Sequence, residues 1–361
     1  MEKTRVAIIF GGRSAEHSIS LRSAKNVIRS IDQSKYDLVF IGIDMLGNWF
    51  HYDTAKKWSE MEQTGKLTLD NPVGKLSLQL EAKGSFVSSN GNEKVSVDVA
   101  FPVLHGPFGE DGSVQGMLKL ASIPFVGPSL LGSAVGMDKD VMKRLLREAG
   151  LPIGKYICLR KGEDIPEFSF FQKELGIPCF VKPANLGSSV GISKAKNEEE
   201  LKKAIEVAFQ YDKKIVIEEF IKGREIECAI LGNENPKASV AGEIVAHHDF
   251  YSFDSKYIDD QGSETVVPAD IPREDEEKIR AFAIKTFTTL ECEGLSRVDI
   301  FYKEDGSMFI NEINTIPGFT SISMYPMLWK ASGIEYGPLI DKLIQLAFDR
   351  FEVEQQYKVE V

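Results

Sequence analysis

Two carboxylates with the spacing of a metal site lie in residues 295–315, the segment LSRVDIFYKEDGSMFINEINT. We predict two strands around a turn at Asp305-Gly306, because Asp-Gly between apolar runs is a strong hairpin signal. Counting outward from a two-residue loop places Asp299 opposite Glu312. Directly opposed residues have Cβ atoms about 4.5–5.5 Å apart, so these carboxylates repel each other unless a cation lies between them.

The same count places Arg297 opposite Asn314, and the alternation of side chains along strands puts both on the face of the two carboxylates. Carboxylate and amide oxygens around a shared gap suit Mg²⁺, which completes its shell with phosphate and water. The alternative is a solvated polar face with Arg297 as the counter-ion. Apolar residues alternate with these side chains as in a core strand, so we favour the metal–phosphate interpretation.

A candidate phosphate loop occupies residues 180–193, FVKPANLGSSVGIS. Lys182 ends a predicted strand, and the glycines and the hydroxyls of Ser188 and Ser189 that follow can offer donors to an anion. This is not a Walker A loop, because the GK[ST] ending is missing and a strand follows. The alternative is an ordinary flexible hairpin. Lys139, in the first turn of its helix, is a second candidate phosphate ligand, although its position alone favours a solvated surface lysine.

Residues 215–227, IVIEEFIKGREIE, begin as an apolar strand and continue into a hinge segment that contains several acidic residues. Exposed backbone groups and a flanking carboxylate in such a place can hold an adenine ring and its ribose. The alternative, a strand with a solvated acidic end, is not excluded by the spacing. The residues concerned are Glu218, Glu219, Phe220, Ile221 and Glu225.

Residues 11–18, GGRSAEHS, follow the first predicted strand but lack the GxGxxG spacing of a dinucleotide site. Glu16 lies where a helix begins, so it either interacts with the helix dipole or receives a substrate ammonium group. His105 lies at the carboxyl end of the third predicted strand, where ligands of open α/β sheets bind. A lone histidine is nevertheless more often structural.

The long loop around residues 247–260 mixes acids and aromatic residues with Lys256 and Tyr257, and loops of this length in compact domains are often lids. His247 and His248 in the same loop invite a metal interpretation, but no third ligand follows at metal spacing.

The composition limits the function. The chain has 361 residues, which indicates two or three domains. Its 43 basic and 54 acidic residues leave a net charge of −11, which argues against general binding to nucleic acid or an anionic membrane but not against a local basic pocket. Four distant cysteines without a CxxC pair are typical of reduced thiols in a cytosolic protein. We expect no leader and no membrane span, since the chain starts directly with a strand and no apolar run is long enough.

Hydrophobic periodicity predicts two kinds of structure along the chain. Residues 1–130 alternate strands and helices, which is typical of an open, mostly parallel α/β sheet. After a helix at 137–150 the pattern changes to antiparallel-looking strands, interrupted by helices at 197–212 and 274–290 and followed by a last helix pair from Met327 onward.

Taken together, these segments resemble the D-alanine–D-alanine ligases of the ATP-grasp fold. The resemblance spans nearly the whole chain and rests on motifs in the family's order: GGRSAEHSISL, HGPFGEDGSVQGML, MDKDVMK, FVKPANLGSSVGIS, IEEFIKGREIE, RVDIFY and NEINTIPGFTSISMYP. It implies an N-terminal open α/β substrate domain (1–135), a central ATP-grasp lobe (136–235) and a C-terminal ATP-grasp lobe with the metal and substrate site (236–361).

The resemblance also implies roles for individual residues. The nucleotide contacts would be Lys139, Lys182, Ser188, Ser189, Glu218, Glu219, Phe220, Ile221, Glu225, Lys256 and Asn311, with Glu219 standing where many members have lysine. Two Mg²⁺ ions, replaceable by Mn²⁺, would be held by Asp299, Glu312 and Asn314. Glu16, Ser188 and Tyr257 would orient the first D-alanine, His105 and Ser323 would contact the second, and Arg297 with the backbone of Gly318 would stabilise an oxyanion.

The implied activity is ATP-dependent ligation of two D-alanine molecules through an acyl phosphate, for peptidoglycan synthesis, by a cytoplasmic homodimer that binds neither nucleic acid nor membrane. Ligases that join D-alanine to D-lactate or D-serine are the nearest alternatives, and Tyr257 after Lys256 favours D-alanine twice. A nicotinamide-linked oxidoreductase is disfavoured by the missing GxGxxG, and a non-catalytic nucleotide-binding protein by the complete set of Arg297, Asp299, Glu312 and Asn314.

Overall fold

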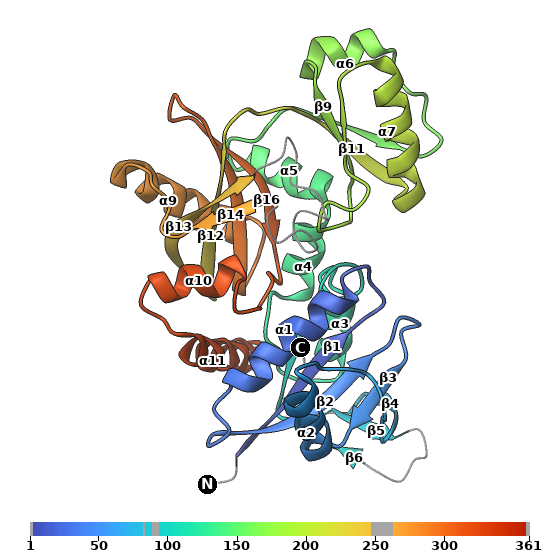
Figure 1. The fold of residues 1–361 in the computed structure, drawn as a ribbon, viewed down its shortest axis with the longest axis vertical. Helices are drawn as coiled ribbons and strands as arrows, with labels where there is room; N and C mark the ends of the chain where they lie inside the picture. Colours follow the sequence, from blue (N-terminus) through green and yellow to red (C-terminus); the bar gives the residue numbers. More distant parts are fainter. Residues whose placement is uncertain (1–2, 82–83, 89–93, 247–262, 359–361) are drawn as a thin grey trace.

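The structure is a computed structural model that describes residues 3–81, 84–88, 94–246 and 263–358. These residues form three β-sheets with helices packed against them (Figure 1). The N-terminal sheet lies at one end of the molecule and a four-stranded sheet lies at the other, with a five-stranded sheet at the middle of its length. Helices α4 (Leu130–Met137) and α5 (Lys139–Glu148) connect the first sheet to the other two.

The N-terminal sheet has seven strands in the order β6-β5-β4-β3-β2-β1-β7. Its elements are β1 (Thr4–Gly11), α1 (His17–Ser30), β2 (Tyr36–Ile43), β3 (Trp49–Tyr52), α2 (Thr54–Thr64), β4 (Gly74–Gln79), β5 (Ser85–Ser88), β6 (Lys94–Val95), β7 (Val99–Val103) and α3 (Ser113–Leu120). The predicted α/β class is confirmed, but the prediction of a mostly parallel sheet is wrong. Within the described ranges β1 is parallel to β2 and β7, whereas the pairings from β2 to β6 are antiparallel. The short turn between β2 and β3 requires this, because a parallel pair needs a crossover of a dozen or more residues.

Strand β1 is buried on both faces, which explains its unbroken apolar sequence. Val6 and Ile8 pack with Val27 of α1 in one core cluster, whereas Ala7 packs with Leu118 of α3 in another. Two-sided packing of this kind holds the carboxyl ends of β1 and β7 in place, and the loops that follow them carry the predicted substrate residues.

The four-stranded sheet has the order β10-β9-β11-β8. Its elements are β8 (Tyr156–Arg160), α6 (Phe168–Leu175), β9 (Cys179–Pro183), β10 (Ser193–Ala195), α7 (Glu198–Tyr211) and β11 (Lys214–Glu219). Val181 and Ile217 point toward α6 and α7 and pack there with Ala204. Side chains alternate along strands, so Lys182 and Glu218 lie on the opposite face, away from α6 and α7.

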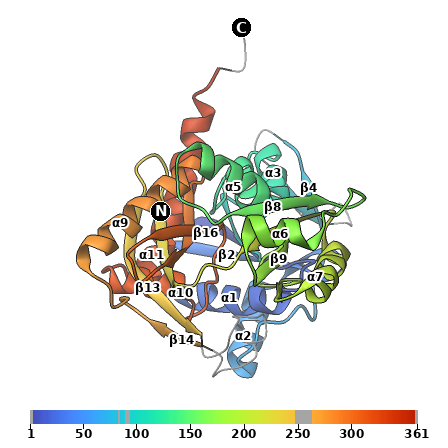
Figure 2. The same ribbon diagram turned by 90° about the horizontal axis from the view of Figure 1, so that it is seen from above.

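The five-stranded sheet has the order β14-β13-β12-β15-β16. Its elements are β12 (Arg224–Gly232), β13 (Lys237–Ala246), β14 (Ser263–Val266), α9 (Arg273–Thr289), β15 (Gly294–Tyr302) and β16 (Met308–Asn314), followed by α10 (Met324–Ala331) and α11 (Tyr336–Gln355). Helix α9 covers one face through Ile279 and Phe287, which pack with Val298 and Ile300. Seen from above, this sheet and the four-stranded sheet lie on opposite sides of the molecule (Figure 2).

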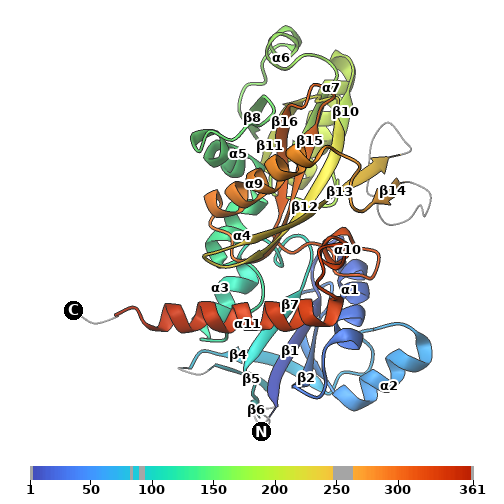
Figure 3. The same ribbon diagram turned by 90° about the vertical axis from the view of Figure 1, so that its left-hand side faces the viewer.

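The last helix ties the C-terminal part of the chain to the N-terminal sheet. Leu339 and Leu343 of α11 belong to the same core cluster as Phe101 of β7. Arg350 of α11 is buried and donates hydrogen bonds to the carbonyl oxygens of Gly127 (2.5 Å) and Phe125 (2.7 Å). Figure 3 shows α11 crossing between the five-stranded sheet and the N-terminal sheet, with its C-terminal end beyond both.

Sheet membership bears on the limits of the lobes. Strand β12 lies entirely before the expected limit at residue 235, yet it is hydrogen-bonded between β13 and β15 of the five-stranded sheet. We therefore propose to place the limit between the two ATP-grasp lobes near residue 220, and we keep the other expected limit as a proposal.

The β15–β16 hairpin has the predicted pairing at its far end but a different turn. The amide N–H of Lys303 donates to Ser307 O, and Gly306 has φ +80°, so the loop has three residues and not the predicted two. A β-bulge at Asn311 then shifts the register back by one residue. The two offsets cancel, so Asp299 does lie opposite Glu312.

Other features of the chain agree with its composition. All four cysteines are free thiols; Cys179, Cys228 and Cys292 are buried and Cys158 is half-buried. Across the residues that the structure describes, no helix combines the length and the apolar character needed to cross a membrane.

Candidate active site

The residues predicted from the hairpin lie together on the five-stranded sheet. Arg297 pairs in register with Asn314, next to the pair of Asp299 and Glu312. The guanidinium of Arg297 donates two hydrogen bonds to Asp299, from Nε to Oδ1 (2.7 Å) and from Nη2 to Oδ2 (2.8 Å). Asn314 Nδ2 donates to the same Oδ2 (2.9 Å). The predicted donor set is thus assembled around one carboxylate.

A third carboxylate, which the sequence analysis left out, joins this group. Glu227 of β12 is opposite Asp299 on the neighbouring strand, and its Oε2 lies 3.0 Å from Arg297 Nε. Burial alone would lower the pKa of Arg297, but the charges of Asp299 and Glu227 raise it well above its ordinary value. The alternation of Glu225 and Glu227 in the strand was the available sequence signal, but the partner strand was unknown.

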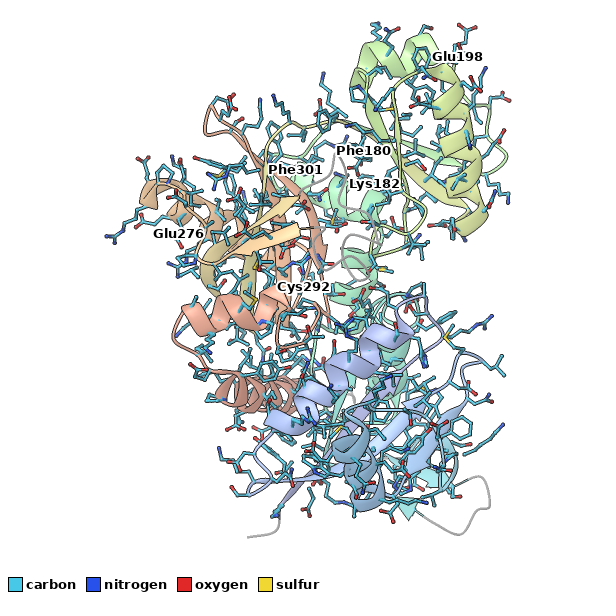
Figure 4. The ribbon with its side chains drawn as sticks, viewed as in Figure 1. Phe180, Lys182, Glu198, Glu276, Cys292 and Phe301 are labelled. Atoms are coloured by element: carbon cyan, nitrogen blue, oxygen red, sulfur yellow. The ribbon has the colours of Figure 1, made fainter. Side chains whose placement is uncertain are left out.

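Lysines from two elements face the carboxylates. Lys139 Nζ at the start of α5 lies 3.7 Å from Glu312. It also donates to the carbonyl oxygen of Leu186 (2.6 Å) in the loop between β9 and β10, residues 184–192, which we call the serine-rich loop. Lys182 of β9 donates to Glu218 (2.8 Å) and reaches Asn311 of β16 (3.4 Å). Figure 4 shows the labelled Lys182 on the side of its lobe that faces the strand carrying Phe301. The two lobes therefore present lysines and carboxylates to each other where they meet.

Glu218 is the centre of a buried charge cluster. Lys182 contacts one of its oxygens, and Lys143 of α5 lies 3.3 Å from the other. Burial alone would raise the pKa of Glu218, but the charges and hydrogen bonds of the two lysines outweigh it and lower that pKa to about 2. Burial lowers the pKa of Lys143, whereas Glu218 and Glu312 raise the pKa of Lys182 against burial. The sequence analysis missed Lys143, which follows Lys139 by one helical turn.

The hinge residues divide between the two lobes. Glu219 Oε1 accepts a hydrogen bond from the backbone N–H of Lys155 (2.6 Å), so its carboxylate has a local structural partner. The exposed ring of Phe220 lies 4.6 Å from Lys194 Nζ. Ile221 follows directly, and Glu225 lies on β12 on the same face as Glu227. The hinge thus joins β11 of one lobe to β12 of the other.

On the N-terminal side, Glu16 contacts the serine-rich loop. Ser188 donates a hydrogen bond to Glu16 Oε1, a contact between residues 172 positions apart. Ser188 and Ser189 both have positive φ (+51° and +60°), a conformation that lets successive backbone N–H groups point to one side. Gly187 packs beside this contact, since a Cβ there would lie 3.5 Å from Glu16 Oε2.

His105 is buried, and the sequence did not predict the residues that surround its ring. Its Nδ1 lies 3.1 Å from Ile316 O and 3.6 Å from Glu110 Oε1, and its Nε2 lies 3.1 Å from Ser23 Oγ. Burial opposes a charge on the ring, but Glu110 and Glu16 raise the pKa of His105 above its ordinary value. Burial raises the pKa of Glu110 to about 7, against the opposing effect of His105. Glu110 occurs in the quoted HGPFGEDGS segment, but nothing in that pattern distinguished it from a surface acid.

Gly318 and Ser323 lie on one loop between β16 and α10. Ser323 Oγ accepts a hydrogen bond from the backbone N–H of Thr320 (3.0 Å) and lies 2.7 Å from Thr320 Oγ1. A Cβ on Gly318 would lie 2.9 Å from Ser323 Oγ, too close for a real contact. The same loop includes Ile316, which contacts His105, so these predicted substrate residues share one structural unit.

Some predicted residues cannot be placed. Lys256 and Tyr257, with His247 and His248, lie outside the described residues. In the ranges that are described, no three His, Cys, Asp or Glu side chains are arranged to hold a metal among themselves. The candidate donor set is instead two carboxylates and an amide, which fits Mg²⁺ because this ion keeps several water and phosphate ligands.

Comparison with known proteins decides the family. Residues 5–128 match the family model described as the D-ala D-ala ligase N-terminus, and residues 145–345 match the model of its C-terminus. The chain belongs to the D-alanine–D-alanine ligase family. D-alanine–D-alanine ligase A of Salmonella typhimurium strain LT2 is 50% identical over 362 residues, covering 99% of each chain.

Solved structures of this ligase family share the fold. The D-Ala:D-Ser ligase VanG from Enterococcus faecalis has a TM-score of 0.85 at 37% identity, covering 96% of this chain and 100% of that one. D-alanine–D-alanine ligase from Bacillus anthracis, complexed with ATP, has a TM-score of 0.73 at 28% identity, covering 97% and 99%. The predicted ATP-grasp fold with an N-terminal α/β domain is confirmed.

Proposed function

We propose that this chain joins two D-alanine molecules at the expense of ATP, giving D-alanyl-D-alanine, ADP and phosphate. The observation that carries the proposal is the convergence of groups from three sheets. Glu16 and His105 come from the N-terminal domain, Lys182 from the central lobe, and Arg297 and Asp299 from the C-terminal lobe. Full-length similarity to D-alanine–D-alanine ligase A supports the substrate choice.

ATP is assigned to the gap between the two lobes. Lys139 and Lys182 would bind its phosphates, together with the hydroxyls of Ser188 and Ser189. The hinge from Glu218 to Ile221 would receive the adenine, and Glu225 the ribose. Asn311 contacts Lys182 and would keep that ammonium group in place. Lys256, in the loop outside the described residues, is assigned to the same nucleotide.

Asp299, Glu312 and Asn314 would hold two Mg²⁺ ions, with Mn²⁺ as a substitute. When bound, these ions neutralise the charge that develops on the phosphates. The chain's own contribution is position, because Arg297 and Asn314 orient Asp299 by hydrogen bonds from two sides. Because these hydrogen bonds already fix the orientation of the carboxylate, it would lose little further entropy on binding a cation.

In the first step, the carboxylate of one D-alanine attacks the γ-phosphorus of ATP, and ADP leaves. Glu16 would hold the ammonium group of that alanine, with Ser188 and Tyr257 completing the contact. The Glu16–Ser188 hydrogen bond joins the N-terminal domain to the serine-rich loop, so the loop would close over the site when substrates are present. Closure excludes water, which would otherwise hydrolyse the acyl phosphate.

In the second step, the amine of the other D-alanine attacks the acyl carbonyl, and phosphate leaves as the amide bond forms. His105 and Ser323 would contact this second alanine. Arg297 and the backbone N–H of Gly318 would donate to the oxyanion of the tetrahedral intermediate. By analogy with other oxyanion donors, such a donor lowers the barrier by about 3–4 kcal/mol.

A phosphate-release assay with ATP, Mg²⁺ and each alanine enantiomer in turn tests the proposal. We expect release with D-alanine and none with L-alanine, and mass spectrometry should show the D-alanyl dipeptide. No D-alanine-dependent release would refute the assignment. The absence of any absorbance change with NADH would separately retire an oxidoreductase.

A second candidate is ligation of D-alanine to D-serine, favoured by the structural similarity to a D-Ala:D-Ser ligase. Competition assays with D-serine and D-lactate beside D-alanine decide between them, since the preferred second substrate gives the dominant product. We further propose a cytoplasmic homodimer, to be tested by light scattering of the purified protein.

A further inference from the structure

Glu227 is a buried carboxylate beside the candidate site, and the proposed reaction gives it no contact with a substrate. Only about 4% of its surface is exposed, and its Oε2 lies 3.0 Å from Arg297 Nε. A carboxylate is rarely buried to this extent without a cationic partner. Its position on β12, in the middle of the sheet, also prevents it from turning away to solvent.

Glu227 extends the two predicted carboxylates to a row of three. Glu227, Asp299 and Glu312 are neighbours in register across β12, β15 and β16. Among the residues that the structure describes, Arg297 and Lys139 contact this row. Glu227 adds a third negative charge to the two of the predicted pair.

The oxygens of Asp299 accept hydrogen bonds and would also have to bind a cation. Arg297 donates to both of them, and Asn314 donates to one. A divalent cation bound to Asp299 would compete with the guanidinium for the same lone pairs and would repel it. Arg297 therefore needs a second carboxylate that stays with it when a cation binds, and Glu227 is in contact with its Nε.

We propose that Glu227 is a positioning residue: it anchors Arg297 so that Asp299 can serve the divalent cations while the guanidinium stays directed at the reacting carbonyl. This inference rests on the proposed function for the role of Arg297. The part that concerns cation affinity depends only on the charges and contacts of the row itself.

The test compares Glu227→Gln with the wild type, because glutamine keeps the size and loses the charge. Glu243→Gln is the matched control: Glu243 lies on β13 of the same sheet and is paired with Arg224 (2.8 and 2.6 Å) away from the row. Four quantities are measured: Mn²⁺ affinity by calorimetry with a non-hydrolysable ATP analogue, kcat and the KM for ATP at saturating Mg²⁺, and Tm.

For Glu227→Gln we expect Mn²⁺ binding about 10-fold weaker and kcat about 10- to 100-fold lower, as is usual for residues that orient metal ligands. The KM for ATP at saturating Mg²⁺ should stay within about 2-fold, because the nucleotide contacts are untouched. The control should match the wild type in Mn²⁺ affinity and kcat. A variant with normal Mn²⁺ affinity and kcat but a lower Tm would show a merely structural ion pair and overturn the proposal.

Glu227→Asp covers the case in which the glutamine variant does not fold. It keeps the charge but retracts the carboxylate, so we expect Mn²⁺ affinity within about 3-fold and kcat lowered several-fold by a displaced Arg297. Wild-type kcat in this variant would contradict the anchor role. If the wild type itself shows no D-alanine-dependent turnover, the proposed function fails, while the Mn²⁺ titration still tests the effect of Glu227 on cation binding.

Discussion

Two buried charge clusters flank the candidate site, and the pKa of the central carboxyl group is shifted in opposite directions in the two. At the proposed nucleotide end, Glu218 lies between Lys143 and Lys182, and its pKa is lowered to about 2. At the proposed alanine end, burial raises the pKa of Glu110 to about 7, beside His105, whose pKa is also raised. Glu218 therefore stays ionised throughout the physiological pH range, whereas Glu110 can exchange a proton within it.

The difference follows from the number of cations around each carboxylate. Two ammonium groups more than offset the burial of Glu218. Glu110 has one histidine, and the nearby charge of Glu16 opposes its ionisation. Lysines held in place by an ionised carboxylate suit the binding of phosphates, whereas a labile proton suits a site that receives an amine. Substitutions in and around the two clusters test this contrast.

The largest effect is expected at Glu312, which lies between the two ends and contacts Lys139. Glu312→Ala removes a proposed metal ligand but also removes the repulsion from Asp299. Turnover should therefore fall by at least about 10²-fold, measured by phosphate release, while the protein stays folded by circular dichroism. A near-normal rate would refute the metal assignment.

Glu218→Gln should disrupt the charge cluster formed by Glu218, Lys143 and Lys182. It leaves two buried lysines without their counter-ion, so we expect a loss of about 3 kcal/mol in unfolding free energy and much weaker ATP binding. Urea unfolding and nucleotide titration measure the two effects. Glu198→Gln, which removes the exposed partner of Lys202 on α7, is the control and should change neither.

The same cluster predicts acid sensitivity. A carboxyl with a pKa of about 2 in the folded state and an ordinary value of 4.5 contributes stability above pH 4.5 and loses it as pH falls toward 2. The wild type should lose about 3 kcal/mol over this window through Glu218. Glu218→Gln should show a shallower acid limb, and equal limbs would contradict the cluster.

Glu110→Gln should remove a pH dependence of opposite sign. A folded pKa of about 7 against an ordinary 4.5 means that the folded state holds the extra proton between these values. Wild-type stability should therefore fall as pH rises from 4.5 to 7, by up to about 3 kcal/mol. The variant should lose this slope in unfolding experiments, whereas Glu62→Gln, at an exposed ion pair with Arg29, should retain it.

The smallest effect is expected at Glu219. Its oxygen accepts a hydrogen bond from the backbone of Lys155, which glutamine can also accept. Glu219→Gln should change the KM for ATP by less than about 3-fold and stability by less than about 0.5 kcal/mol. A tenfold change in the KM would instead give the charge of Glu219 a role in nucleotide binding.

Much of the site was predictable because its residues are close in sequence. Strand alternation predicts that Arg297 and Asp299 share a face. The hydrogen bonds that Asp299 accepts from Arg297 and from Asn314 confirm it. The pairing of Asp299 with Glu312 is also confirmed, although the assumed two-residue loop is wrong. A three-residue loop and a bulge at Asn311 compensate for each other, so the correct pairing came from two errors that cancel.

The order of residues along the chain was enough to indicate candidate site residues and to show which of them share a strand face, since period-two alternation is a local property of the backbone. The tertiary structure alone decided their partners. Glu227 meets Arg297, Lys143 meets Glu218, and Glu110 meets His105 within a shell closed by Ile316. Most of these contacts join residues on separate elements, and each also depends on burial, which sets the strength of a charge and arises only when the sheets pack together.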